Sequence, residues 1–363
     1  LAQEEIGTLG FLMRVRDGRH QLLVQGKIEP GNVGLAQLAP TCQATESNAR
    51  QLHGGAPPPF ISDFEPDARE ALYDVLQSEQ GSRFLRKRNR NVLTLVTGDE
   101  PLPPTHRWLD VDVVLGLLWR DYLVNTDARS VLVCSPWHLL VNRVPFSLHE
   151  DGFGHELFAS MNTSSGHGLL ETVKERVRLL RLATEQPRTV NLEELPQWHW
   201  TDEGFAPLAG CSLRVRHLGA AVRGREVPRW DQPIIDSGSD GSVLLVCARI
   251  DGILHFLFRL QPEPGLRSRV ELTATVVVEP GHLSGPMVGR WGGRVVAQCR
   301  QSEEGGRFYR DTNFYQIVDA GVAAEADANF CWLTLGDVRE LLNESGWLTN
   351  EARSVLSLLL PWM

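Results

Sequence analysis

The sequence contains one polar block twice. Gln77–Asn91 reads QSEQGSRFLRKRNRN and Gln301–Asn313 reads QSEEGGRFYRDTN, with eight identical residues in register. A Glu-Pro-Gly motif also occurs twice, beginning at Glu29 and at Glu263. A pattern repeated over this distance predicts a chain built from two copies of one structural unit. The differences between the copies then indicate where ligand binding is concentrated.

Each copy is expected to place strands before helices, which predicts an α+β fold. In the first copy, Leu9–Arg16 and Gln21–Ile28 flank an Asp-Gly pair, which is a hairpin signal. A third strand is expected over Leu38–Thr45. If the chain stays extended beyond Gly81, alternate side chains of the basic run share one face. Two helices are expected to follow, one starting near Asp110 and one over residues 128–132.

The repeat also predicts the domain boundaries. The first unit is expected over residues 1–137, a helical connector over 138–190, and the second unit over 191–363. The second unit has a front part, about 191–236, that has no counterpart in the first, so we expect the matching segment to precede Leu1. Two such units normally pack around a pseudo-twofold axis.

The composition excludes several classes of protein. With 363 residues, of which 42% are hydrophobic, the chain can form two apolar cores. The net charge of -9 argues against a general nucleic-acid-binding protein. The six cysteines follow no metal-ligand or disulfide spacing, and no apolar run is long enough to span a membrane, so a cytoplasmic location is expected. Dinucleotide, phosphate-loop and metal-box motifs are missing, so we expect no cofactor and no metal.

The main ligand site is expected in the first copy, because polar residues there are lost in the second. The replacements are Lys27 by Gln261, Asn32 by Leu266, Gln43 by Val277, Lys87 by Asp311, and Arg90 by Phe314. The basic run suits a diphosphate, because guanidinium groups offer paired donors to phosphate oxygens. A solvated edge strand protected by charge is the alternative.

Segments across nearly the whole chain resemble the NDP-hexose 2,3-dehydratases. The segments are KIEPGN from Lys27, QLAPT from Gln37, QAT from Gln43, SN at Ser47, the block Gln77–Asn91, WDQPII from Trp230, and the copy Gln301–Arg310. The resemblance implies a tandem duplication of a Nudix-like α/β module, a homodimer, and a dTDP-linked 4-keto-6-deoxy sugar as substrate. It also implies that both modules bind nucleotide. The metal box of Nudix hydrolases is missing, so hydrolysis is not implied.

The chemistry implied by this family is a dehydration without a redox cofactor. A base removes the C3 proton beside the 4-ketone, and the C2 hydroxyl then leaves with help from an acid. The product is a 3,4-diketo-2,6-dideoxy sugar nucleotide, which passes to a downstream 3-ketoreductase in deoxysugar and antibiotic biosynthesis. Glu29 or Glu79 is the candidate base. Lys27 or His53 is the candidate acid or enolate partner.

The remaining candidate residues are expected to bind ligand. The predicted substrate-binding residues are Asn32, Gln37, Thr41, Gln43, Ser47, Asn48, Ser78, Arg86, Lys87, Arg88, Asn89, Arg90 and Asn91. A second nucleotide site is predicted at Trp230, Arg307, Tyr309, Arg310 and Asn313. Two other functions fit the pattern, a non-catalytic nucleotide-sugar-binding protein and a Nudix-type hydrolase.

Overall fold

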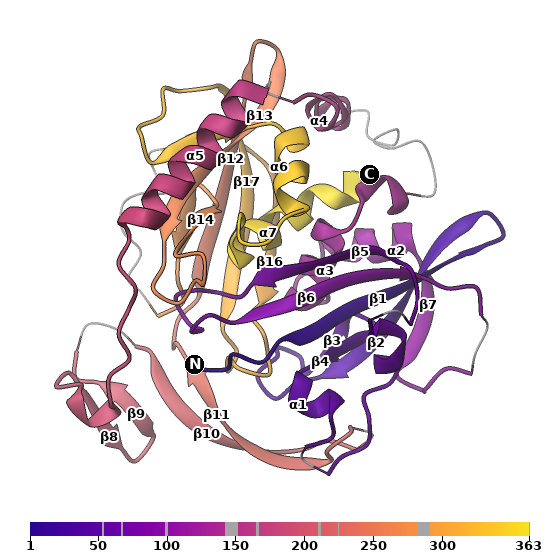
Figure 1. The fold of residues 1–363 in the computed structure, drawn as a ribbon, viewed down its shortest axis with the longest axis vertical. Helices are drawn as coiled ribbons and strands as arrows, with labels where there is room; N and C mark the ends of the chain where they lie inside the picture. The colour runs from indigo at the N-terminus through magenta and orange to yellow at the C-terminus, as the bar shows by residue number, and fades with distance from the viewer. Residues whose placement is uncertain are drawn as a thin grey trace.

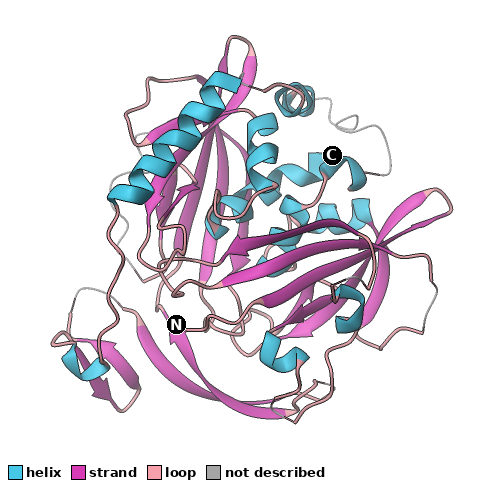
Figure 2. Cartoon of the chain, viewed as in Figure 1, coloured by secondary structure: helices cyan, strands magenta, loops and turns pink. Residues whose placement is uncertain are grey.

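The computed structural model describes residues 1–52, 54–66, 68–98, 101–141, 152–164, 167–209, 212–223, 225–281 and 291–362. These residues form three β-sheets and seven α-helices (Figures 1 and 2). The mixed helix and strand content expected from the sequence is therefore confirmed.

The first sheet has seven strands in the central order β3-β2-β1-β6-β5. Two short strands complete it, because β4 pairs with β1 and β7 pairs with β2. Strands β1 and β6 run parallel, whereas the other pairs are antiparallel. The strands are β1 (Gly7–Arg16), β2 (Arg19–Ile28), β3 (Ala36–Ala39), β4 (Cys42–Ala44), β5 (Ala71–Ser78), β6 (Arg88–Leu95) and β7 (His106–Asp110).

The second sheet has the same connectivity as the first, element by element. Its central order is β14-β13-β12-β17-β16, with β15 on β12 and β18 on β13. Strands β12 and β17 are the parallel pair. The strands are β12 (Gly241–Ile250), β13 (Ile253–Pro262), β14 (Val270–Thr273), β15 (Val276–Val278), β16 (Arg294–Ser302), β17 (Thr312–Val322) and β18 (Phe330–Leu333).

A third, four-stranded sheet lies in the front part of the second unit, ahead of the second seven-stranded sheet in the chain. Its order is β11-β10-β9-β8, formed by β8 (Trp198–Thr201), β9 (Gly204–Pro207), β10 (Arg214–Ala221) and β11 (Arg229–Asp236). The long hairpin of β10 and β11 passes beneath the first sheet in Figure 1. This hairpin brings residues of the second copy to a site in the first.

Helices from the two copies meet between the large sheets. The helix α3 (Thr126–Cys134) lies beside its counterpart α7 (Asn350–Leu356) (Figure 1). The longest helix, α5 (His167–Ala183), packs on β13 and β14. The other helices are α1 (Glu46–Ala49), α2 (Val111–Leu117), α4 (Phe153–Met161) and α6 (Leu335–Leu342), and the 3-10 turns are η1 (Ile61–Phe64), η2 (Trp137–Leu139), η3 (Leu192–Glu194) and η5 (Ser357–Trp362).

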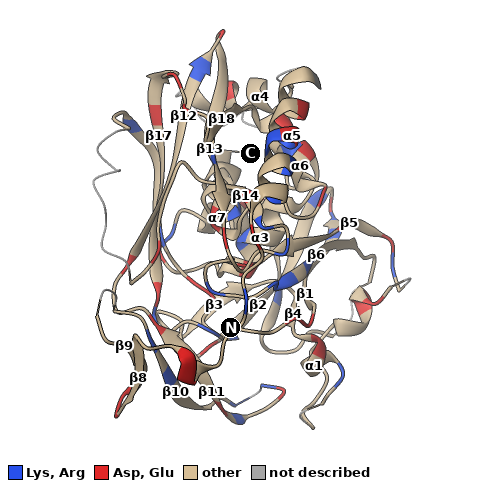
Figure 3. Cartoon of the chain, turned by 60° about the vertical axis from the view of Figure 1, so that its left-hand side comes forward, with Lys and Arg blue, Asp and Glu red and all other residues tan. Residues whose placement is uncertain are grey.

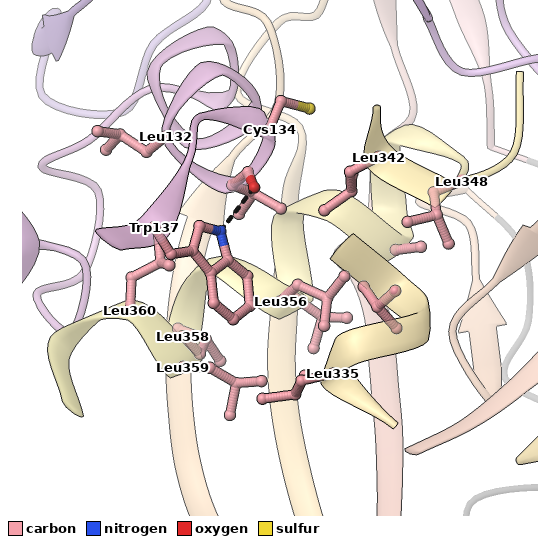
Figure 4. Packing of buried hydrophobic residues seen from close by; sticks show 14 of the residues in the cluster. Leu132, Cys134, Trp137, Leu335, Leu342, Leu348, Leu356, Leu358, Leu359 and Leu360 are labelled. Carbon is pink, nitrogen blue, oxygen red and sulfur yellow. Dashed lines mark hydrogen bonds between the residues drawn. The ribbon is translucent and has the colours of Figure 1, made fainter. Parts of the chain in front are cut away.

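One hydrophobic core runs through both copies. It extends from Leu9 in β1 to Trp362 at the end of η5. Figure 4 shows Trp137 of the first copy lying among leucines of the second, including Leu356 and Leu359. The indole Nε1 of Trp137 donates to the carbonyl of Val133 at 2.8 Å, so its one polar atom is satisfied inside the apolar layer. Because the core is shared, we expect the two copies to unfold together.

Several local predictions are confirmed and two are wrong. The Asp-Gly hairpin joins β1 to β2, α2 and α3 lie where the sequence predicts them, and α5 lies within the segment expected to be a helical connector. The expected strand Leu38–Thr45 is instead two short strands, because Pro40 has no N–H for the ladder and the chain changes partner there. The chain also turns after Gly81, and β6 begins only at Arg88. Arg86, at φ 55°, lies in that turn.

Basic and acidic residues are interspersed along the chain in the view of Figure 3. Within the described ranges, no helix combines the length and apolar character needed to cross a membrane.

Candidate active site

A cavity of about 450 Å³ lies where the first sheet meets the turn before β17 and the hairpin β10–β11. Its size falls in the range of small-molecule binding sites. The polar and charged residues that line it are Gln3, Glu5, Lys27, Glu29, Gln43, Thr45, Ser47, Asn48, Lys87, Asn89, Asp127, Arg225, Glu226, Trp230, Asp231, Gln232, Glu304 and Arg307.

The end of β2 supplies two charged residues to this cavity. Lys27 and Glu29 are two positions apart in an extended segment, so their side chains project to the same side. The Lys27 ammonium donates to the backbone carbonyl of Gln43 at 2.7 Å. Burial lowers the pKa of Lys27, and the nearby Glu29 carboxylate opposes that shift.

The amide of Gln43 holds Glu29 in place. Its Nε2 donates to Glu29 Oε1 at 3.1 Å, while its Oε1 accepts from Asn125 Nδ2 at 2.9 Å. Asn125 is itself fixed as the N-cap of α3, because its side chain accepts from the backbone N–H of Ala128. The second oxygen of Glu29, Oε2, has no hydrogen-bond partner among the described residues. One carboxylate oxygen is therefore oriented and the other is left without a donor.

Two further carboxyl groups of this cavity have raised pKa values. Asp127 lies in the first turn of α3, and Glu304 lies in the repeated block of the second copy. Burial raises the pKa of Asp127 well above its usual value, and repulsion from Glu304, Glu79 and Glu29 acts in the same direction. Burial also raises the pKa of Glu304. The raised pKa makes Asp127 a candidate proton donor in the cavity wall.

Residues of the second copy reach this cavity because the two copies exchange backbone hydrogen bonds. The N–H of Gly31 donates to the carbonyl of Gly305 at 2.8 Å, and the N–H of Arg310 donates to that of Gly31 at 2.7 Å. A Cβ atom at Gly31 would lie 1.8 Å from the carbonyl oxygen of Phe308, so only glycine permits this approach. The same exchange links Gly265 to Gly81. Each copy therefore contributes to the site region of the other.

Glu79, the other candidate base, lies behind the cavity wall. Both of its oxygens are occupied: Oε1 accepts from Asn89 Nδ2 at 2.8 Å, and Oε2 accepts from Asn350 Nδ2 at 3.1 Å. Burial raises the pKa of Glu79 to about 7. In the second copy Glu303 accepts from Asn313 in the same way, which indicates a shared structural role.

Seven of the predicted catalytic and substrate-binding residues come together at the cavity. Lys27, Glu29, Gln43, Ser47, Asn48, Lys87 and Asn89 line the cavity. Five others are used in packing: Thr41 bonds the backbone of Leu12 and Leu23, Gln37 bonds Ser302, Ser78 bonds Glu271, Asn91 bonds Ser130, and Asn32 packs against Gly305. His53 lies outside the described residues.

The three arginines predicted to surround a diphosphate do not reach this cavity. Arg86 and Arg88 line a separate depression with Arg267, because Arg86 lies in the turn before β6. Arg90 forms an ion pair with Asp74, at 2.5 Å, on the neighbouring strand β5. Of the basic run, Lys87 alone lines the cavity.

The five residues predicted as a second nucleotide site are also separated. Trp230 and Arg307 line the cavity already described, because β11 and the repeated turn cross to the first copy. The N–H of Tyr309 bonds the backbone of Ile235, Arg310 is exposed, and Asn313 bonds Glu303.

Sequence reasoning missed Asp127, Glu304, Arg225 and Glu226. A signal existed for two of them. Asp127 and its counterpart Glu351 are both acidic in the repeated helix, and Glu304 differs from its counterpart Gln80 within the repeated block. The other two come from the hairpin β10–β11, whose position over the first copy has no local signal. Among the described residues, no group of three or more His, Cys, Asp or Glu side chains has the arrangement of a metal site.

Comparison with known proteins places these residues in a family context. A model of the NDP-hexose 2,3-dehydratase family matches residues 1–135 and 178–359. A dTDP-4-dehydro-6-deoxy-alpha-D-glucopyranose 2,3-dehydratase from Saccharopolyspora spinosa is 36% identical, over 98% of this chain and 76% of that protein. Enzymes of the same name from Amycolatopsis orientalis and Streptomyces violaceoruber are each 33% identical, over 98% of this chain and 74% and 81% of their own lengths. A solved ADP compounds hydrolase is 15% identical with a TM-score of 0.27, covering 48% of this chain and 92% of its own.

Proposed function

This chain belongs to the NDP-hexose 2,3-dehydratase family, and we propose that it removes the C2 hydroxyl of dTDP-4-dehydro-6-deoxy-glucose. The observation that carries the proposal is the set of carboxyl and amine groups gathered on the walls of one cavity. Glu29, Asp127 and Lys27 supply a base, an acid and a cation, which are the groups that the elimination requires.

The reaction proceeds through an enolate. The ketone at C4 acidifies the C3–H bond, and removal of this proton places a negative charge on the C4 oxygen. Collapse of the enolate reforms the C4 carbonyl, creates a C2–C3 double bond, and expels the C2 hydroxyl as water once it receives a proton. The resulting C3 enol tautomerises to the 3,4-diketo sugar. The C3–H and C2–O bonds break, one water leaves, and the other changes are proton transfers, so atoms and electrons balance without an oxidant.

Glu29 is the proposed base. It lines the cavity, its Oε1 is oriented by Gln43, and its Oε2 has no donor in the described residues. Glu79 is less suitable, because both of its oxygens already accept hydrogen bonds and it does not line the cavity. A base must reach the proton that it removes, and this geometry decides between the two glutamates.

Asp127 is the proposed acid for the C2 hydroxyl. Burial raises its pKa well above the usual value for aspartate, which favours the protonated form that a general acid needs. Lys27 is the proposed partner of the enolate oxygen, since its buried ammonium already points toward Gln43 and faces Glu29. Gln43 and Asn89 are proposed to orient the hexose.

The nucleobase is proposed to lie beside Trp230. The Trp230 indole donates to Gln232 at 2.8 Å, and the guanidinium of Arg225 lies 5.4 Å from the ring centre. Gln232 also donates to the carbonyl of Gly306, so the hairpin is anchored to the second-copy turn that borders the cavity. An aromatic ring fixed at a cavity wall is a stacking surface for a planar base.

We also propose that the chain is a tandem duplication of one module. The two seven-stranded sheets share one strand order, and the exchange of backbone hydrogen bonds is reciprocal, which supports two copies of one module. The Nudix-like fold of that module stays a prediction from the family resemblance. The proposed boundaries are residues 1–137, 138–190 and 191–363. The homodimer, the downstream 3-ketoreductase, the role in antibiotic biosynthesis and the cytoplasmic location stay predictions from the sequence.

The function is tested by incubation with dTDP-4-dehydro-6-deoxy-glucose and mass spectrometry. The proposal predicts a sugar nucleotide lighter by one water, or its breakdown to free dTDP. Release of dTMP would instead indicate a Nudix-type hydrolase. Binding with no change in mass would indicate a non-catalytic sugar-nucleotide-binding protein.

A further inference from the structure

Asn125, the N-cap residue of α3, uses both polar atoms of its side-chain amide. Its backbone N–H donates to the carbonyl of Leu38 at 2.9 Å, and its side chain is buried, so the residue has a fixed position. The side-chain oxygen accepts from the backbone N–H of Ala128 at 2.8 Å. The side-chain nitrogen donates to Gln43 Oε1 at 2.9 Å.

These contacts fix the direction of two amides in a row. A backbone N–H can only donate, so the oxygen of Asn125 faces Ala128 and its nitrogen faces Gln43. Gln43 therefore accepts on its oxygen, and its nitrogen is turned toward Glu29 Oε1, at 3.1 Å. Reversal of either amide would place two oxygens, or two N–H groups, against each other. The start of α3 thus determines which end of the Gln43 amide meets the carboxylate.

The second copy shows what the cap itself requires. The counterpart of Asn125 is Thr349, whose hydroxyl caps α7 by accepting from the backbone N–H of Ala352 at 3.3 Å. Capping therefore requires only an oxygen. The counterpart of Gln43 is Val277, which has no polar side-chain atom to accept or donate a hydrogen bond. The amide nitrogen of Asn125 therefore serves something other than the cap.

The glutamate of the second copy indicates what this nitrogen does. Glu263 corresponds to Glu29, and burial raises its pKa to about 8, with repulsion from Glu279 and Glu271 in the same direction. A buried glutamate in this place thus favours its protonated form, which cannot act as a base. A hydrogen bond donated to a carboxylate favours the charged form instead, and in the first copy Gln43 supplies that bond.

We propose that Asn125 is a positioning residue for the base Glu29 and acts through Gln43. This inference deepens the proposed function and rests on it, because Glu29 is a base only if this chain carries out the dehydration. Asn125 is not one of the described residues that line the cavity, so its influence on the reaction passes through the Gln43 amide. The oxygen left to take the proton is Glu29 Oε2, and the bond at Oε1 sets its direction.

The test compares Asn125→Thr with the matched control Thr349→Ser in steady-state kinetics. Asn125→Thr introduces the cap residue of the second copy and lacks the amide nitrogen that holds Gln43. We expect kcat to fall about 10- to 100-fold, the scale of a small misplacement of a catalytic group, with KM unchanged. Thr349→Ser keeps the hydroxyl that caps α7 and should retain the wild-type kcat. If Asn125→Thr does not fold, as judged by circular dichroism, Asn125→Ser replaces it with the same expected result.

A double-mutant cycle with Gln43→Val separates positioning from a purely structural role. Gln43→Val introduces the residue of the second copy and removes the amide through which Asn125 acts. Adding Asn125→Thr to Gln43→Val should therefore cause no further loss of kcat. In Asn125→Thr alone, deuterium exchange at C3 of the substrate should fall by the same factor as kcat, because the affected group is the base.

Two results would overturn the inference and leave the proposed function intact. One is the wild-type kcat in folded Asn125→Thr. The other is an equal fold-loss of kcat from Asn125→Thr in the wild-type and Gln43→Val backgrounds, which a structural defect would give. Absence of dehydration by the wild type would reject the proposed function and the inference with it, so turnover by the wild type distinguishes the two failures.

Discussion

Replacement of Arg129 by methionine should destabilise the whole chain. Arg129 is fully buried in α3, where it lies between the copies. Its guanidinium donates to the carbonyl of Val124 at 2.7 Å, to Gln301 Oε1 at 3.3 Å and to the carbonyl of Ser302 at 3.2 Å. Two of these acceptors belong to the other copy, so one side chain joins the first helix pair to the second sheet.

The size of the effect follows from the acceptors that lose their donor. Methionine keeps much of the side-chain volume, so the main loss is three hydrogen bonds. A buried acceptor without its donor costs about 1–3 kcal/mol, and backbone carbonyls that retain a second partner lie at the lower end. Three such losses give a decrease in the free energy of unfolding on the order of 3 kcal/mol. The control Arg19→Met removes exposed ion pairs to Asp110 and Asp112 and should cost less than about 1 kcal/mol.

The assay is urea unfolding followed by circular dichroism and tryptophan fluorescence. Both probes should report one transition, because the core is continuous across the copies. Arg353 is the counterpart of Arg129 and donates to the carbonyl of Ser78 at 2.6 Å, so Arg353→Met should give a similar loss. A decrease below about 1 kcal/mol in both variants, or two separate transitions in the wild type, would refute this reasoning.

Three further predictions concern the carboxyl groups. Asp127→Asn should lower turnover about 10²- to 10⁴-fold, the usual contribution of a general acid. The control Glu351→Gln, at the equivalent position of the second copy, should retain turnover. Steady-state assays of the two variants measure this difference. Wild-type turnover should fall as the pH rises through the raised pKa of Asp127, since the acid loses its proton, and a pH profile that instead falls only on the acid side would contradict its role. Burial raises the pKa of Glu263 to about 8, so the folded state favours the protonated form and stability should fall as the pH rises from the usual glutamate pKa toward 8. Glu263→Gln should remove that loss. The gain in stability of the variant over the wild type should therefore be larger at pH 8 than at pH 5, by an amount on the order of 1 kcal/mol or more. An equal difference in the urea midpoint between variant and wild type at both pH values would contradict this role of Glu263.

The sequence predicts those parts of the site that depend on local structure. Lys27 and Glu29 are predicted together because a strand alternates its side chains, and this rule holds at the end of β2. Asp-Gly turns and helix starts are also predictable, because each depends on a few neighbouring residues. The repeat is visible because its residues recur in one order, and the two sheets have the same connectivity.

Long-range placement cannot be read from these patterns. The expectation that Arg86 and Arg88 reach the site depends on an extended chain, but the left-handed residue Arg86 redirects it. Glu304 and Arg307 reach the first copy because the turn that carries them contacts Gly31 at close range. Such a contact joins segments far apart in the chain, and no local propensity specifies it.

The central claim is that Glu29 removes the C3 proton and Asp127 protonates the leaving hydroxyl. The most direct measurement is solvent deuterium exchange at C3 of dTDP-4-dehydro-6-deoxy-glucose, followed by NMR. Asp127→Asn should incorporate deuterium at C3 without losing the C2 hydroxyl, because its base is intact and its acid is missing. Glu29→Gln should neither exchange C3 nor eliminate water. Exchange at the wild-type rate in folded Glu29→Gln would contradict the account.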